Sequence, residues 1–283
     1  MDIRTQRQNT RQAAQALAPL ADEHELVVTH GNGPQVGLLA LQSEAYAEGG
    51  RVPLDVLGAE SEGLIGYLLE QEIRRALPGR DLATLLTQVE VDPNDDAFRH
   101  PTKPIGPTYT ESRARTLAQD RGWAIARESQ DAFRRVVASP EPGRILELEA
   151  IRLLVAARVL VICGGGGGIP VVADAEGAFD GVPAVIDKDL SSALLAAELE
   201  ADVLLLLTDQ PAVFSDWPAA RGPLLAVAPA ELRALSLDPG SMGPKAEAAC
   251  RFVERTGRRA AIGALSDAGR ILQGRAGTTV MPA

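Results

Sequence analysis

Residues 25–41, ELVVTHGNGPQVGLLAL, are the stretch that decides the fold. An apolar run, Leu26–Val28, stops at Thr29, and a Gly-Asn-Gly-Pro segment at 31–34 leads into a second apolar segment. A continuous apolar run of this kind indicates a buried strand, and the segment after it has a helical pattern. The stretch therefore predicts a strand, a glycine-rich loop and a helix, a unit typical of α/β sheets.

The same reading extends along the chain. VLVIC (159–163) and ADVLLLLTD (201–209) are apolar with almost no alternation. Such strands, separated by helices, are typical of a parallel sheet buried on both faces. Two more strands are predicted at 83–91 and 260–265. Helices are predicted at 2–22, 34–46, 54–76, 145–156, 189–199, 229–236 and 243–256. The 283 residues suffice for one large α/β domain or two small ones.

One region does not follow this alternation of strands and helices. Residues 92–142 are polar, weakly periodic and carry six prolines. The region is too long for a plain loop, which indicates an inserted subdomain or lid. A disordered linker between two domains is the alternative, but Trp123, Phe133 and Val136 indicate local packing.

Composition excludes several classes of protein. The net charge of −10 and the pI of about 4.9 argue against a nucleic-acid or anionic-membrane partner. The histidines have no ligand spacing, so no metal site is predicted, and Cys163 and Cys250 are expected to be buried. The N-terminus has no secretory signal pattern and no run is long enough to span a membrane, so we expect a soluble, cytoplasmic protein.

The predicted strands end in unusual sequences. One ends in the Gly-Asn-Gly loop, one in GGGGGIP (164–170), and one in Thr208-Asp209. Ligands of open parallel sheets bind at the carboxyl ends of strands, and glycine backbone there can present N–H groups to an anion. A tight turn alone would also need glycine. Two glycine clusters at strand ends favour an anion cradle.

The common nucleotide and hydrolase motifs are missing. The sequence has no G-x-x-x-x-G-K-[ST], which excludes a P-loop enzyme, and no strict G-x-G-x-x-G with an acid at the right distance. It also lacks G-x-S-x-G, which argues against an α/β-hydrolase.

The candidate polar groups are specific. Asp187-Lys188-Asp189 lie at a predicted strand-to-helix junction, where either acid alone could be an ordinary N-cap. Lys245 lies in the first turn of a helix, where a bound anion would offset its unfavourable interaction with the helix dipole. Lys103 lies in a proline-bracketed loop of the insert, where it could also be a solvated surface lysine. Lysines, acids and glycine loops together suit phosphoryl transfer, which needs positioning and charge neutralisation.

Eight stretches, in order along nearly the whole chain, resemble the carbamate kinases of the amino acid kinase family. They are VVTHGNGPQVGLLALQ (27–42), PLDVLGAESEGLIGYLLEQE (53–72), TQVEVD (87–92), PTKPIGP (101–107), GGGGIPVV (165–172), VIDKDLSSALLA (185–196), LLLLTD (204–209) and PGSMGPKAEAACRFVE (239–254). The combination of HGNGPQVG, TKPIGP and VIDKD is the specific part of the resemblance.

The resemblance implies an α/β fold of three αβα layers with a mainly parallel central sheet over 1–283, and a small protruding lid subdomain at 92–142. It implies reversible phosphoryl transfer between MgATP and carbamate, giving carbamoyl phosphate and MgADP, in arginine metabolism. It also implies a cytoplasmic homodimer whose Mg²⁺ arrives with the nucleotide.

Site residues are carried over by position. Lys188 and Lys245 would hold the transferring phosphoryl group, Asp189 would organise them, and Lys103 would descend from the lid. The residues that would bind the substrate are Gly31, Asn32, Gly33, Gly165 and Gly166. Those that would border the nucleotide are Asp187, Thr208, Asp209, Met242 and Pro244.

Two departures from the family pattern carry expectations. Pro211 stands where the family usually has a second acid, which puts the affinity for the adenine side in doubt. Relatives begin with a strand and a Gly-Gly-Asn loop, whereas this sequence begins inside the helix that follows. We expect this chain as written to be poorly active or inactive, because the loop should supply N–H groups to the phosphoryl group. We also expect it to be less stable than a relative that has the strand, because ladder groups on the neighbouring strands would be unpaired.

Two other functions stay open at this point. One is a related amino acid kinase that acts on another small acid. The other is a non-catalytic dimer that binds a nucleotide or anion, although the retained lysines and Asp189 argue against it.

Overall fold

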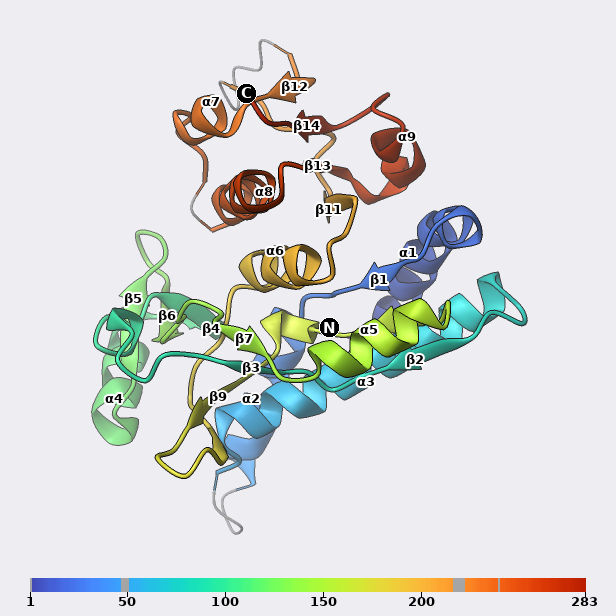
Figure 1. Cartoon of the computed structure of the whole chain (residues 1–283). Helices are drawn as coiled ribbons and strands as arrows, with labels where there is room; N and C mark the ends of the chain where they lie inside the picture. Colours follow the sequence, from blue (N-terminus) through green and yellow to red (C-terminus); the bar gives the residue numbers. More distant parts are fainter. Residues whose placement is uncertain (1, 47–50, 216–221, 239) are drawn as a thin grey trace.

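The computed structural model describes residues 2–46, 51–215, 222–238 and 240–283. Figure 1 shows helices on both sides of short strands, with the last third of the chain grouped together. The helices are α1 (Ile3–Glu23), α2 (Gly33–Ala45), α3 (Leu54–Ala76), α4 (Glu111–Arg121), α5 (Leu148–Ala156), α6 (Lys188–Glu198), α7 (Pro229–Arg233), α8 (Met242–Thr256) and α9 (Ala268–Leu272).

The strands within the described ranges belong to four sheets. Strands β1 (Val27–Val28), β8 (Leu160–Ile162) and β2 (Leu82–Thr84) form a parallel sheet in the order β1-β8-β2. A second sheet has the order β11-β13-β14-β12, with β11 and β13 parallel. Its strands are β11 (Val203–Thr208), β13 (Arg259–Ala264), β14 (Thr278–Val280) and β12 (Ala226–Val227). A third sheet, β10-β9-β3-β7, consists of β10 (Phe179–Gly181), β9 (Ile169–Ala173), β3 (Gln88–Glu90) and β7 (Arg144–Ile145).

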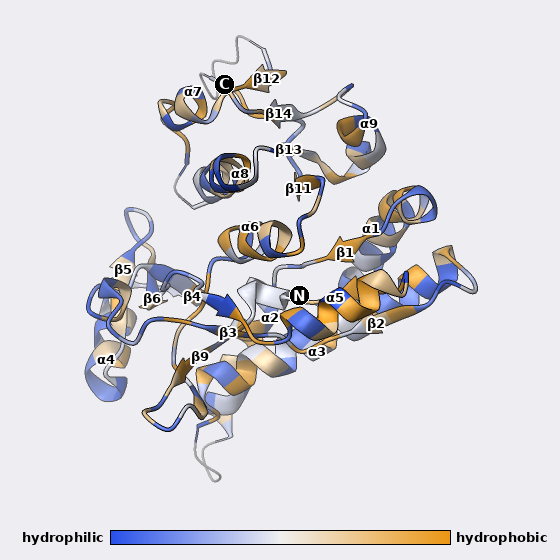
Figure 2. Ribbon diagram, viewed as in Figure 1, coloured by the Kyte–Doolittle hydropathy of each residue, from blue (hydrophilic) through white to orange (hydrophobic). Residues whose placement is uncertain are grey.

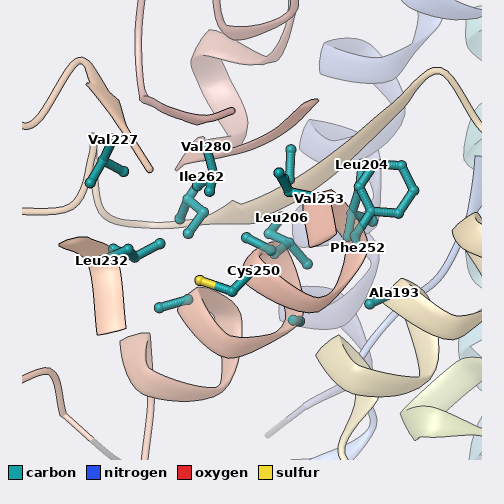
Figure 3. Packing of buried hydrophobic residues seen from close by; sticks show 14 of the residues in the cluster. Ala193, Leu204, Leu206, Val227, Leu232, Cys250, Phe252, Val253, Ile262 and Val280 are labelled. Atoms are coloured by element: carbon teal, nitrogen blue, oxygen red, sulfur yellow. The ribbon is translucent and has the colours of Figure 1, made fainter. Parts of the chain in front are cut away.

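Strands buried on both faces produce the layers. In β11, Leu204 and Leu206 pack into a core with α6 and α8, whereas Leu205 and Leu207 pack against the core built by α1 and α3. Successive side chains of a strand point to opposite faces, so an apolar residue at every position needs helices on both sides. Figure 3 shows Leu204 and Leu206 beside Phe252, Val253 and Ile262 in the first of these cores. The fold is therefore the expected α/β arrangement, with helices on both faces of parallel strands.

The strand predicted at 83–91 is wrong as a single element. Its first part, β2, pairs with β8, and its last part, β3, pairs with β9 in another sheet. Between them the chain turns aside at Thr87, whose N–H donates to the carboxylate of Glu62 at 3.2 Å. The local pattern could not reveal this break, because the Glu62 carboxylate that accepts the Thr87 N–H lies 25 residues away in the sequence.

The helix predicted at 145–156 begins late, because Ile145 pairs with Val89 in β7 and α5 starts at Leu148. Strands β9, β10, β12 and β14 lie outside the predicted elements. Residues 184–186, predicted as the end of a strand before Asp187, belong to no strand. The remaining predicted helices and strands are confirmed, with shifts at their ends, and α3 has the predicted bounds. Both cysteines are buried, as expected.

Part of the proline-rich region forms a small sheet of its own. Strands β4 (Lys103–Tyr109), β6 (Phe133–Val137) and β5 (Ala124–Arg127) pair antiparallel in the order β4-β6-β5, and α4 packs with them. Figure 1 shows this group to one side of the remaining elements. Ile105 and Val137 belong to a core with residues of α2 and α3, so the start of β4 is held close to the main body.

Candidate active site

Helix α6 begins at the candidate catalytic segment. Asp187 is its N-cap, and the Asp187 carboxylate accepts the N–H groups of Asp189 at 2.9 Å and Leu190 at 3.3 Å. Lys188 and Asp189 therefore occupy the first helical turn. The preceding residues 184–186 form only an isolated bridge, between Ala184 and Ala138, so the predicted strand before this junction is wrong.

Asp189 joins two lysines from different helices. Its carboxylate accepts from Lys188 Nζ at 2.5 Å and from Lys245 Nζ at 3.0 Å. The carboxylate is nearly buried, with 7% of the side chain exposed, and Lys245 is 12% exposed. Two ammonium groups share one carboxylate, so the cluster has an excess positive charge beside the first turns of α6 and α8. An anion would complete this charge arrangement.

The third lysine arrives from the small sheet. Lys103, the first residue of β4, donates to Asp187 at 2.8 Å. Burial alone would raise the pKa of Asp187, but the Lys103 charge and the hydrogen bonds hold that pKa below its usual value. The Asp187 carboxylate thus caps α6 and at the same time ties β4 to it.

These three residues are the only lysines in the sequence. The rest of its 28 Lys and Arg residues are arginines. All three bond to the adjacent acids Asp187 and Asp189. Burial lowers the pKa of Lys188, the charge of Lys245 adds to the decrease, and Asp189 opposes it. The structure thus brings together four residues proposed as catalytic from the sequence.

The Gly-Asn-Gly loop lies beside this cluster. A Cβ atom on Gly31 would lie 3.4 Å from Cδ of Lys188. Asn32 is buried and its side-chain amide donates to Ser61 Oγ at 2.9 Å. Gly33 begins α2 with Pro34 next to it, and the first N–H groups of a helix have no intrahelical acceptor. Gly31 therefore lies beside the Lys188 side chain, and both line one cavity.

The second glycine cluster differs from the expectation of an N–H cradle. The N–H of Gly165 donates to Glu62 at 2.8 Å, and that of Gly166 donates to the His30 carbonyl at 2.7 Å. The N–H groups of Gly164, Gly167 and Gly168 also donate within the protein. The cradle interpretation is wrong for this cluster in this structure, because all five donors are already used. A contribution of Gly165 or Gly166 to substrate binding would therefore come from where the loop lies, and not from hydrogen bonds donated by their N–H groups.

These glycines are needed for space. A Cβ on Gly165 would lie 2.4 Å from His30 Cε1, and one on Gly166 would lie 2.1 Å from Asn32 Nδ2. Gly166 also has a φ of +67°, which side chains disfavour. The side chains of the first glycine loop therefore pack directly on the second.

The sequence reasoning missed Glu62 and His30. Glu62 is 1% exposed, and burial raises its pKa to about 7. Burial also lowers the pKa of His30, whose Nε2 has no hydrogen-bond partner among the described residues. An acid within the apolar pattern of the helix predicted at 54–76 was the available signal for Glu62.

The residues proposed to border the nucleotide lie at element ends. Thr208 ends β11, and its hydroxyl donates to Asp209 at 3.0 Å. Met242 and Pro244 lie in the first turn of α8, as Lys245 does. Met242 and Pro244 therefore lie in the same helical turn as a lysine of the cluster.

A cavity of about 1380 Å³ extends from this site between two sheets. Its walls come from α1, β1, α6 and β11, and its lining includes Gly31, Lys188 and Asp189. Strands β1 and β11 both carry hydrophobic residues (Figure 2). Among the described strands, β1 pairs only with β8, and β11 pairs only with β13. Each of these two strands therefore has one edge that pairs with no described strand.

The described residues offer neither a metal-binding cluster nor a membrane-spanning helix. They contain no group of three or more His, Cys, Asp or Glu side chains placed to hold a metal ion. None of the helices traced in the described ranges is long and apolar enough to cross a membrane.

The chain is similar in sequence and fold to several known proteins. The sequence model of the amino acid kinase family matches residues 3–264. A carbamate kinase of Rhizobium meliloti (strain 1021) is 53% identical, over 99% of this chain and 87% of that protein. One of Haemophilus influenzae is 50% identical, over 99% of this chain and 91% of that protein. The structure of a carbamate kinase from Giardia lamblia bound to AMP-PNP matches with a TM-score of 0.90 and 39% identity, over 100% of this chain and 93% of that one.

Proposed function

The chain belongs to the amino acid kinase family, and from that premise we propose that it catalyses the carbamate kinase reaction. It would transfer a phosphoryl group reversibly between MgATP and carbamate, giving MgADP and carbamoyl phosphate. The observation that carries the proposal is the Lys188–Asp189–Lys245 cluster beside the Gly31 loop. Identities of 53% and 50% to carbamate kinases, over nearly the whole chain, support the choice of acceptor.

In this reaction a carbamate oxygen forms a bond to the γ-phosphorus while the bond from that phosphorus to the β,γ-bridging oxygen breaks. Negative charge spreads over the oxygens of the transferring group, and little covalent work is left to the protein. Lys188 and Lys245 would lie against those oxygens and neutralise that charge. Asp189 would keep the two ammonium groups at a fixed separation, since it already accepts from both.

The acceptor end of the site would be the first glycine loop. Gly31, Asn32 and Gly33 would place backbone close to carbamate, with the start of α2 directed at its negative charge. Lys103 would approach from the insert at 92–142, which we propose to act as a lid. Its bond to Asp187 supports this, because that bond already links β4 to the start of α6.

The nucleotide would lie at the opposite end, bordered by Asp187, Thr208, Asp209, Met242 and Pro244. Magnesium would arrive as part of MgATP or MgADP, since that ion is commonly held by phosphates and few protein carboxylates. Pro211 follows this segment, and a weakened affinity for the adenine side stays a prediction. A homodimer is part of the proposal on the basis of the family resemblance.

The direct test is ATP formation from carbamoyl phosphate and MgADP by the 283-residue chain. We expect that any ATP formed by the unaltered chain, even at a low rate, falls to background in Lys188→Ala. Arg115→Ala, on exposed α4, is the control and should keep the activity.

A second measurement separates the alternatives. Phosphorylation of other small carboxylic acids, without that of carbamate, would point to a related kinase. Binding of MgADP with no turnover of any acid would point to the non-catalytic reading.

A further inference from the structure

One turn of α3 touches both glycine loops. Ser61 accepts a hydrogen bond from the Asn32 amide of the first loop, and Glu62 accepts one from the Gly165 N–H of the second loop. Both side chains are almost completely buried, with 0% of Ser61 and 1% of Glu62 exposed. Two neighbouring residues therefore fix the positions of two loops that are far apart in sequence.

The second oxygen of Glu62 extends this hold. It accepts the N–H of Thr87 at 3.2 Å, and the Thr87 hydroxyl accepts the N–H of Gly164 at 2.8 Å. Glu62 thus fixes Gly165 directly and Gly164 through Thr87. The same bonds fix the turn by which the chain passes from β2 to β3.

Among the described groups that shift the pKa of Glu62, none carries a positive charge. The titratable groups near it are Glu147 at the start of α5, Cys163 after β8 and the buried His30. Glu147 and the lack of water oppose ionisation, whereas the backbone N–H groups favour it. An apolar side chain would avoid this cost, so the carboxylate calls for a reason other than stability.

We propose that Glu62 is a positioning residue: its ionised carboxylate accepts two backbone N–H groups at once and so holds the loop 164–168 in place. Gly166 then donates to the His30 carbonyl, and Asn32 packs on Gly166. Gly31, which lies between them in sequence, is held beside Lys188. Glu62 acts through these groups and touches no reacting atom.

A glutamine at position 62 has nearly the same shape but cannot accept both backbone hydrogen bonds. Its carbonyl oxygen can accept from Gly165, while its amide would present N–H groups to the N–H of Thr87. One buried donor is then left without an acceptor. Glu62→Gln therefore resembles the protonated acid at every pH. Glu60→Gln, on the same helix but exposed, is the matched control.

The kinetic arm rests on the proposed function. We expect Glu62→Gln to raise the KM for carbamoyl phosphate about tenfold or more, with a smaller change in kcat. The KM of the unaltered chain should fall between pH 6 and pH 8, as Glu62 ionises, whereas the KM of Glu62→Gln should not show this fall. Glu60→Gln should follow the unaltered chain.

The second arm needs no activity. Hydrogen exchange of the Gly164 and Gly165 amides, corrected for the intrinsic effect of pH, should show greater protection at pH 8 than at pH 6 in the unaltered chain. Glu62→Gln should show low protection at both. Protection equal to that of the unaltered chain in Glu62→Gln would overturn the proposal, and so would an unchanged pH profile of KM. If the unaltered chain forms no ATP, the proposed function fails, and the exchange comparison alone decides on Glu62.

Discussion

Lys245 donates a hydrogen bond of 3.0 Å to Asp189, which lies 56 positions earlier in the chain. The bond brings together the first turns of α8 and α6, and with them the two ammonium groups of the candidate site. Asp189 is the shared point of this arrangement, because it also accepts from Lys188. Its removal is therefore the most informative single change.

Asp189→Asn leaves Lys188 and Lys245 close together without their carboxylate. We expect a loss of roughly 2–4 kcal/mol in the free energy of unfolding, because a nearly buried ion pair loses one partner while Lys188 is partly solvated. We expect activity to fall about a hundredfold or more. Urea unfolding and ATP formation measure the two effects.

Carbamoyl phosphate should raise the melting temperature of Asp189→Asn more than that of the unaltered chain, since an anion replaces the lost charge. Asp120→Asn, exposed on α4, is the control. An Asp189→Asn chain with normal stability and activity would contradict the role given to this carboxylate.

The lowered pKa of Lys188 can be tested by the rate at which its amine is acylated. Lys188 and Lys103 are equally exposed, at 35% and 34%, and they are two of only three lysines in the sequence. Only the neutral amine reacts with a small acylating reagent. At pH 8 we expect Lys188 to be acylated several-fold faster than Lys103, and MgADP with carbamoyl phosphate to protect it. Peptide mass spectrometry gives both rates, and faster reaction of Lys103 would refute the expectation.

Gly166→Ala tests the packing of the two glycine loops. Gly122 has the same φ of +67°, but nothing lies within 4 Å of the position of its Cβ, so Gly122→Ala carries the backbone strain alone. That strain costs about 1–2 kcal/mol. Gly166→Ala adds a clash with Asn32 and should cost roughly 1–3 kcal/mol more. Equal urea midpoints for the two variants would show that Asn32 moves away freely.

Burial of Glu62 gives stability a defined pH dependence. Its pKa is about 7 in the folded chain and near 4.5 when exposed, so the folded state binds more protons between these values. Stability should therefore fall as the pH rises from 4.5 to 7, by an amount on the order of 3 kcal/mol.

Glu62→Gln should abolish that fall, and urea unfolding at pH 5 and pH 8 compares the two chains. A fall of the same size in the variant would assign it to other groups. The ionised state thus costs stability at the pH where we propose that it holds the loop.

The cavity between β1 and β11 predicts that the unpaired edge of β11 is accessible to solvent. Amides on the unpaired edge of β11 should exchange with solvent hydrogen much faster than those of β13, which is paired on both sides by β11 and β14. Ile262, in β13, is the internal reference. Uniform protection across β11 would show that this edge is covered in solution.

The sequence determined the elements whose cause is local. Helix α3 is predicted at its observed bounds because its apolar spacing is that of a helix over its whole length. The parallel strands are recognisable because burial on both faces makes every position apolar. Lys245 is recognisable because a lysine in the first turn of a helix, opposed by the helix dipole, calls for a partner. Lys188 is recognisable because it stands between two acids at a predicted strand-to-helix junction.

Only the tertiary structure decided how these parts meet. The division of residues 82–90 between two sheets depends on Glu62, which accepts the Thr87 N–H from another helix. The same residue takes the N–H of Gly165, which the sequence alone had assigned to an anion. A glycine cluster shows that space and backbone freedom are needed, but not which group uses its donors. That depends on side chains brought close by folding from distant parts of the chain, and no local pattern carries this information.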